Sequence, residues 1–222
     1  YYAVQKDMDI RTGGPTLIDF DMQRISQRIN IILNIRTEGD IKKEDLLPPI
    51  IELSGACGHF NISEACLDTT RLYRMVHQAQ PDEFTQTGEN TYRCVVHFHT
   101  LGVIPSAAKG HLNGPGILQV ALQVSANRLD ASGAPVLDQD GKPVKNSRYI
   151  YGAINPYDEL TAAQLIEVRD GKTYLRYSKD DVNIEITSPL VIKADQIVSD
   201  DTGMGWQPND PTNPDDDIII EI

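Results

Sequence analysis

The sequence predicts an α+β fold, in which a predominantly antiparallel β-sheet, arranged as a sandwich or a barrel, follows two N-terminal helices. Aliphatic and polar residues alternate over 117–127, and apolar residues recur at three- and four-residue spacing between Met22 and Leu33. An Asp-Gly pair also separates two short strand-like runs late in the chain. We therefore expect a helical N-terminal part over 1–82 and a β-rich body over 83–198.

The segment 117–127 is the clearest strand in the chain. Its aliphatic side chains fall on one side of an extended backbone, and its glutamines fall on the other. A helix would scatter the same aliphatic residues around its circumference, so the pattern excludes a helix. We place this strand at the centre of the sheet. Its aliphatic face consists of Leu118, Val120, Leu122 and Val124.

Two helices are predicted in the N-terminal part. The first covers about 19–35, begins at an aspartate that can cap it, and has one apolar stripe. The second covers about 61–78 and has a weaker stripe. The stripe of the first helix contains Met22, Ile25, Ile29, Ile32 and Leu33. The inner face of the second helix contains Cys66, Thr70, Tyr73 and either Val76 or His77.

The remaining strands are predicted from short apolar runs between turn signals. Hairpins are expected at 87–90 and at the Asp-Gly pair 170–171, and a polar loop over 129–146 is expected to protrude between two strands. A helical turn is expected near 160–164. The predicted strands cover 50–53, 84–86, 91–99, 148–151, 166–169, 172–177, 182–186 and 190–192.

The last segment, 199–222, reads as an acidic flexible arm that ends in an apolar strand. An exposed apolar strand is unfavourable in water, so we expect it to add to its own sheet or to the sheet of a neighbouring subunit. The predicted interface residues are those of this strand together with two aspartates of the protruding loop. They are Ile218, Ile219, Ile220, Ile222, Asp138 and Asp140.

The composition excludes several classes of protein. A net charge of −12 and the lack of any Lys/Arg-rich run argue against a nucleic-acid-binding surface. No apolar run approaches the ~20 residues of a transmembrane helix, so membrane insertion is not expected. Three cysteines are too few for a disulfide scaffold and indicate reduced thiols. The first residues do not have the pattern of a signal peptide and leave processing of the N-terminus open.

Cysteines and histidines raise the question of a metal site. Zinc favours sets of four Cys and His ligands, and six such residues are available. Their spacing matches no zinc signature, and strand pleating turns Cys94 away from His97 and His99. Buried thiols and histidines on a polar sheet face explain the same residues, so we predict no metal and no cofactor while leaving the site open. The six residues are Cys57, His59, Cys66, Cys94, His97 and His99.

Two alternatives to a structural role remain. His97-x-His99 resembles half of a cupin metal motif, although the expected glutamate is replaced within 100–105; this resemblance implies a metal-binding β-sandwich enzyme, completed by His111 or an acidic residue. No nucleophile elbow or phosphate-binding loop is present, and we predict a protein without enzymatic activity. A carbohydrate- or receptor-binding module is the second alternative. Its stacking residues would be Tyr149, Tyr151 and Tyr157.

Two segments resemble virion proteins. The run 181–197 resembles the short-strand repeats of trimeric phage tail spikes, and 28–40 is similar to the helix-then-Gly/Glu segment of baseplate sheath initiators. These resemblances imply a structural protein of a phage tail or baseplate, assembled in the host cytoplasm into the virion. Its partners would be other copies of itself and other virion proteins, contacted through the terminal strand and the protruding loop.

Overall fold

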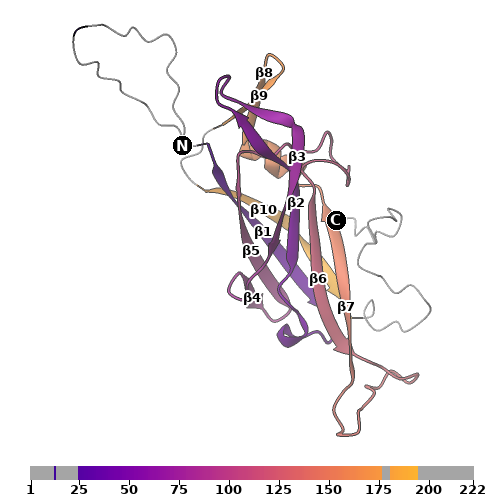
Figure 1. Cartoon of the computed structure of the whole chain (residues 1–222). Coiled ribbons are helices and arrows are strands. Elements are labelled where there is room, and N and C mark those ends of the chain that lie inside the picture. The colour runs from indigo at the N-terminus through magenta and orange to yellow at the C-terminus, as the bar shows by residue number, and fades with distance from the viewer. Residues whose placement is uncertain (1–12, 14–24, 177–180, 195–222) are drawn as a thin grey trace.

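The computed structural model describes residues 13, 25–176 and 181–194, and these residues form a sandwich of two β-sheets (Figure 1). The four-stranded sheet has the order β10 (Val182–Lys193), β1 (Gln27–Glu38), β5 (Thr91–Thr100) and β4 (Phe84–Gly88). The six-stranded sheet has the order β7 (Lys145–Ile154), β6 (Leu118–Asn127), β2 (Ile50–Asn61), β3 (Cys66–Gln78), β9 (Lys172–Leu175) and β8 (Ile166–Arg169). All neighbouring strands are antiparallel except β1 and β10, which run parallel.

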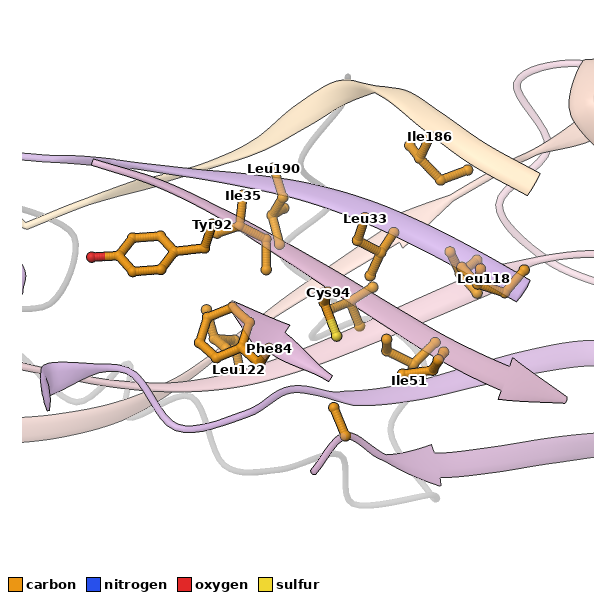
Figure 2. Packing of buried hydrophobic residues seen from close by; sticks show 14 of the residues in the cluster. Leu33, Ile35, Ile51, Phe84, Tyr92, Cys94, Leu118, Leu122, Ile186 and Leu190 are labelled. Atoms are coloured by element: carbon orange, nitrogen blue, oxygen red, sulfur yellow. The ribbon is translucent and has the colours of Figure 1, made fainter. Parts of the chain in front are cut away.

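The core fills the space between the two inner faces of the sandwich. Every second residue of β6 is buried, and β5 contributes Cys94, Val96 and Phe98 from the opposite sheet. Figure 2 shows side chains of the two sheets converging, with Leu33 and Leu190 on one side and Leu122 on the other. Alternate side chains of a strand point to opposite faces, so period-two sequences place one apolar row in this space. The alternation predicted for 117–127 is confirmed.

The prediction of an α+β fold with two N-terminal helices is wrong. The residues expected to form the first helix include β1, and those expected to form the second include β3. β1 lies inside its sheet, and its run of apolar residues buries Ile32 as well as the inward-facing Ile31 and Leu33. A strand buried in this way reads as a continuous apolar run, which also satisfies helical spacing.

Most of the predicted strands of the body are present. The hairpins β4–β5 and β8–β9 form where their turns were predicted, and Asp170 and Gly171 adopt the positive φ values that a type I′ turn requires. The helical turn becomes helix α1 (Tyr157–Ala163), and a short 3₁₀ turn, η1 (Lys43–Asp45), precedes β2. The two runs around Pro189 form one strand, β10, at a sheet edge, where proline costs no ladder hydrogen bond.

The two sheets approach each other along the side formed by β7 and β10. A Cβ atom on Gly152 of β7 would lie 3.3 Å from a methyl group of Leu190 on β10. On the opposite side, β3 faces the turn that leads into β4. The two sheets therefore pack against each other at β7 and β10 on one side of the sandwich. On the other side, β3 packs against the turn before β4, and the surface described next lies there.

Truncation of a core side chain tests this packing. Leu122 is 0% exposed between the sheets, and we expect Leu122→Ala to lower the free energy of unfolding by about 2–5 kcal/mol because it removes buried methyl groups and leaves a cavity. The matched control is Leu137→Ala, at a leucine that is 57% exposed, which should change it by less than about 0.5 kcal/mol. Urea unfolding followed by circular dichroism measures both, and equal losses would contradict the core assignment.

Candidate functional site

β3 has a long uncovered edge in the part of the chain that the structure describes, in addition to the outer edges of the terminal strands β7 and β10. β3 pairs with β2 along one edge from Cys66 to Gln78, but on its other edge β9 pairs only at Leu67. No described strand follows the outer edge of residues 69–78, a segment called the β3 edge below. Half of the N–H and C=O groups of an antiparallel strand point to each edge, so this edge presents a template for another strand.

Apolar side chains on the β3 edge are exposed on both faces of the sheet. Leu72 is 38% exposed and Val76 is 62% exposed on the outer face, while Tyr73 is 46% exposed on the opposite face. Figure 1 shows β2 and β3 at one end of the sandwich, and most of β3 is exposed there. Apolar residues on an uncovered edge favour association, because natural sheets normally protect their edges with charges, prolines or bulges.

The β3 edge contains two arginines in a chain of net charge −12. Between residues 69 and 78 lie Arg71 and Arg74 and no carboxylate. Arg74 Nη1 lies 3.1 Å from Glu52 Oε1 on β2, although 69% of the arginine side chain remains exposed. An exposed ion pair of this kind stabilises by only about 0–1 kcal/mol, so Arg74 can exchange its partner at little cost.

Tyr73 is seated on a glycine of the neighbouring strand. A Cβ atom at Gly58 would lie 2.4 Å from Tyr73 Cε2, so a larger residue there would displace the ring from this position. The Tyr73 hydroxyl lies 3.4 Å from His59 Nδ1, and the two rings have centroids 5.7 Å apart. The geometry holds this aromatic side chain against β2 while leaving nearly half of it accessible.

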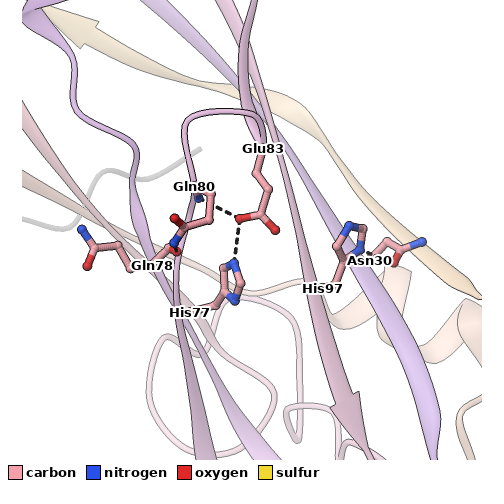
Figure 3. Close-up of polar contacts among 6 residues, drawn as sticks. All are labelled: Asn30, His77, Gln78, Gln80, Glu83 and His97. Atoms are coloured by element: carbon pink, nitrogen blue, oxygen red, sulfur yellow. Dashed lines mark hydrogen bonds and ion pairs between the residues drawn. The ribbon is translucent and has the colours of Figure 1, made fainter.

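A polar cluster lies at the end of the β3 edge that faces the other sheet (Figure 3). His77 Nε2 lies 2.7 Å from Glu83 Oε2, and the backbone N–H of Gln80 donates to the same oxygen over 2.8 Å. Burial raises the pKa of Glu83, but the hydrogen bonds from His77 and Gln80 outweigh burial and hold the pKa below its usual value. The cluster thus joins β3 to the turn before β4.

The histidines predicted as ligands do not converge on one site among the described residues. His97 and His99 lie on the face of β5 opposite Cys94, as strand pleating predicted. His97 Nδ1 lies 2.7 Å from Asn30 Oδ1, and Asn30 donates in turn to Asn183 over 2.7 Å (Figure 3 shows the first pair). His111 lies in the loop before β6, where its backbone oxygen accepts from Asn155. Within the described residues, no group of three His, Cys, Asp or Glu side chains is placed to hold a metal.

The three cysteines are free and buried. Burial raises the pKa of Cys57 to about 11 and that of Cys94 to about 12, and burial together with the Glu64 carboxylate raises the pKa of Cys66. Thiols with raised pKa values are poor nucleophiles at neutral pH. These cysteines therefore serve as small apolar core residues.

Two of the three predicted stacking tyrosines meet on the outer face of the six-stranded sheet. Tyr149 pairs with Gln123 and Tyr151 with Ala121, and the two rings have centroids 6.1 Å apart. Tyr157 lies on α1, outside this sheet.

A shallow polar hollow lies on the outer face of the six-stranded sheet, between β2, β3, β6 and the loop before β6. Its polar lining consists of Glu52, Ser54, Arg74, Asn113 and Gln119.

The protruding loop contains a tandem repeat that the sequence prediction missed. Residues 129–136 and 137–144 share the pattern Leu-Asp-x-x-Gly-x-Pro-Val, which the sequence displays directly. Each copy folds into the same turn, because Oδ1 of Asp130 or Asp138 accepts hydrogen bonds from the backbone N–H groups two and four residues later. The carboxylate of Asp138 therefore stabilises its own turn, and Asp140 lies exposed beside it. The two turns lie in the connection between β6 and β7, and the role of this loop as an interface remains a prediction.

The other predicted interface residues, Ile218, Ile219, Ile220 and Ile222, lie outside the described residues. Among the described residues, no helix is long and apolar enough to cross a membrane. In comparisons with known proteins, no family model matches the chain, and neither a curated protein nor a solved structure matches it significantly. The geometry of the surface is therefore the basis for the function proposed below.

The Glu83 cluster predicts how stability depends on pH. A carboxylate whose pKa is lowered in the folded state stabilises the fold above its unfolded pKa, and this contribution is lost as the pH falls. We expect Glu83→Gln to lower the free energy of unfolding at pH 7 by about 1–2 kcal/mol, with the difference from wild type shrinking below about pH 5. Chemical unfolding across this pH range measures it. Glu89→Gln, at an exposed turn residue, is the control, and a pH-independent difference would contradict the prediction.

Proposed function

We propose that the chain is a non-enzymatic structural subunit of a virion, in a phage tail or baseplate, and that it acts through subunit–subunit contacts. The observation that supports this proposal is the uncovered β3 edge with its exposed Leu72, Tyr73 and Val76. An isolated soluble protein gains nothing from such an edge and risks aggregation. A subunit of an assembly uses the same edge for main-chain pairing with its neighbour.

The other sheet edges are less suited to this role. β4 has 5 residues and β8 has 4, so each offers only a short ladder. β10 contains Pro189, which cannot donate to a new strand. β7 has an unpaired outer edge of 10 residues, but Tyr149 is its one exposed large apolar side chain, whereas β3 has three. Among the described strands, β3 is therefore the best acceptor for a partner.

The polar side chains also favour a structural role. His97, one of the two histidines that a cupin-like enzyme would use, is hydrogen-bonded to Asn30, and His77 is hydrogen-bonded to Glu83. The His97 contact links two strands that are distant in sequence, and the His77 contact ties β3 to the turn that follows it, which is a sufficient structural role for each histidine. The buried cysteines, with their raised pKa values, likewise support packing rather than catalysis.

A charged residue on the β3 edge should block assembly. We expect Val76→Lys to weaken self-association at least tenfold, because it removes an exposed apolar side chain that a paired strand would cover and adds an ammonium group that pairing would have to desolvate. Val76 is 62% exposed, so the fold should tolerate the change. Native mass measurement and sedimentation over a range of protein concentrations report the association constant.

The matched control for this experiment is Val168→Lys on β8. Val168 is 67% exposed and also lies at the end of a sheet, but its strand has only 4 residues. The Val168→Lys variant should leave the association constant unchanged. A wild-type chain that stays monomeric at all concentrations and in the presence of other virion proteins would contradict the proposed function, as would equal effects of the two lysines.

A second candidate function is carbohydrate binding on the outer face of the six-stranded sheet. The observation that favours it is the pair Tyr149 and Tyr151 beside Gln123, close to the polar hollow. Sugars bind to aromatic rings through their apolar faces and to neighbouring amide and carboxylate groups through their hydroxyls. This function is compatible with a structural subunit that contacts a surface.

A glycan array and titration test this second candidate. If the wild-type chain binds a glycan, we expect Tyr149→Ala to lower the affinity for that glycan at least tenfold, because stacking area is lost. Tyr157→Ala is the control, since this tyrosine lies on α1 and should leave binding unchanged. A wild-type chain that binds no glycan, or equal losses for the two variants, would exclude a sugar site at this face.

A further inference from the structure

We infer that the β3 edge accepts the C-terminal segment 217–222 of a neighbouring copy of the same chain. This inference rests on the proposed function and deepens it, because it names both the acceptor edge and the strand that occupies it. The occupant is a segment outside the described residues, and three properties of the chain identify it: its side-chain pattern, its charge and its position relative to the edge.

The side-chain pattern of the segment is that of a half-buried strand. In an extended backbone, Ile218, Ile220 and Ile222 fall on one face, while Asp217, Ile219 and Glu221 fall on the other. The β3 edge has matching properties, since apolar side chains lie on both of its faces and Arg74 lies between Leu72 and Val76 on the outer one. Main-chain pairing would cover these side chains and the isoleucines together.

The charges of the two segments are complementary. Residues 195–222 contain eight acidic residues and no lysine or arginine, whereas 69–78 contains two arginines and no carboxylate. Opposite charges that face each other across paired strands stabilise the pair, and like charges destabilise it. Pairing of two β3 edges would place four arginines together. The charges therefore favour the C-terminal segment over a second β3 edge as the occupant.

The position of the arm favours exchange between copies. The last described residue, Ala194, follows β10 and donates its backbone N–H to the carbonyl oxygen of Glu38 at the end of β1, on the side of the sandwich formed by β7 and β10. The β3 edge lies on the opposite side. The residues between Ala194 and Ile218 can extend to roughly 80 Å, which is ample to reach a neighbour. An intramolecular path would have to wrap around the sandwich, so a neighbouring edge is the more accessible acceptor.

Disulfide trapping between full-length chains tests this inference. One preparation carries Val76→Cys, another carries Ile220→Cys, and the two are mixed before mild oxidation. The native cysteines are buried, and two of them have pKa values of about 11 and 12, so the introduced thiols should react first. We expect disulfide-linked heterodimers at least tenfold more abundant than in a mixture of Val168→Cys with Ile220→Cys.

The outcomes separate this inference from the proposed function. A heterodimer yield equal to that of the Val168 control would overturn the inference, and so would dimers of Val76→Cys alone, which indicate pairing of two β3 edges. A chain carrying both substitutions that cross-links only within itself would also overturn it. If Val76→Lys still blocks assembly in these cases, the proposed function stands and the occupant of the edge is another strand.

Discussion

The burial of alternate side chains between two facing sheets is the constraint on which the rest of the structure depends. β6 and β5 each place every second residue in this space, and the outward-facing residues are then left for polar contacts. Those contacts follow the same geometry, because His97 can reach Asn30 only when Cys94 and Val96 point inward. A single period-two register therefore determines both the core and the chemistry of the outer faces.

This constraint stops where β2 and β3 extend beyond the facing sheet. Met75 of β3 still packs against the core. Tyr73, two residues earlier on the same face, packs on Gly58 of β2 and not on the facing sheet. The strand keeps its pairing with β2 but loses cover on its faces and on its outer edge. Hydrogen bonds to one neighbour hold such a strand in place, while apolar exposure makes a second neighbour favourable.

The sequence predicted the body of the fold better than its first half, and the reason lies in the environments of β1 and β3. β6 is covered on one face only, so its alternation is clear. β1 is buried on both faces around Ile31, Ile32 and Leu33, so its sequence is a continuous apolar run without the two-residue alternation that identifies a strand. β3 is exposed on both faces over much of its length, so it has no apolar row to detect. The β3 edge could not be predicted from the sequence, because pairing between distant segments decides which strand edges stay uncovered. The tandem repeat in the loop, by contrast, was visible in the sequence.

Acidity and an exposed apolar edge are linked by the problem of solubility. A strand with Leu72 and Val76 exposed on an open edge would pair with any extended apolar segment unless something restricted its partners. Charge supplies such a restriction: arginines on the edge repel another copy of the same edge, and net negative charge keeps the sandwich bodies apart. A segment that is both apolar and acidic satisfies the two conditions at once. In the proposed assembly, the aspartates before Ile218 therefore act in specificity as well as solubility, since they distinguish the intended strand from other apolar ones.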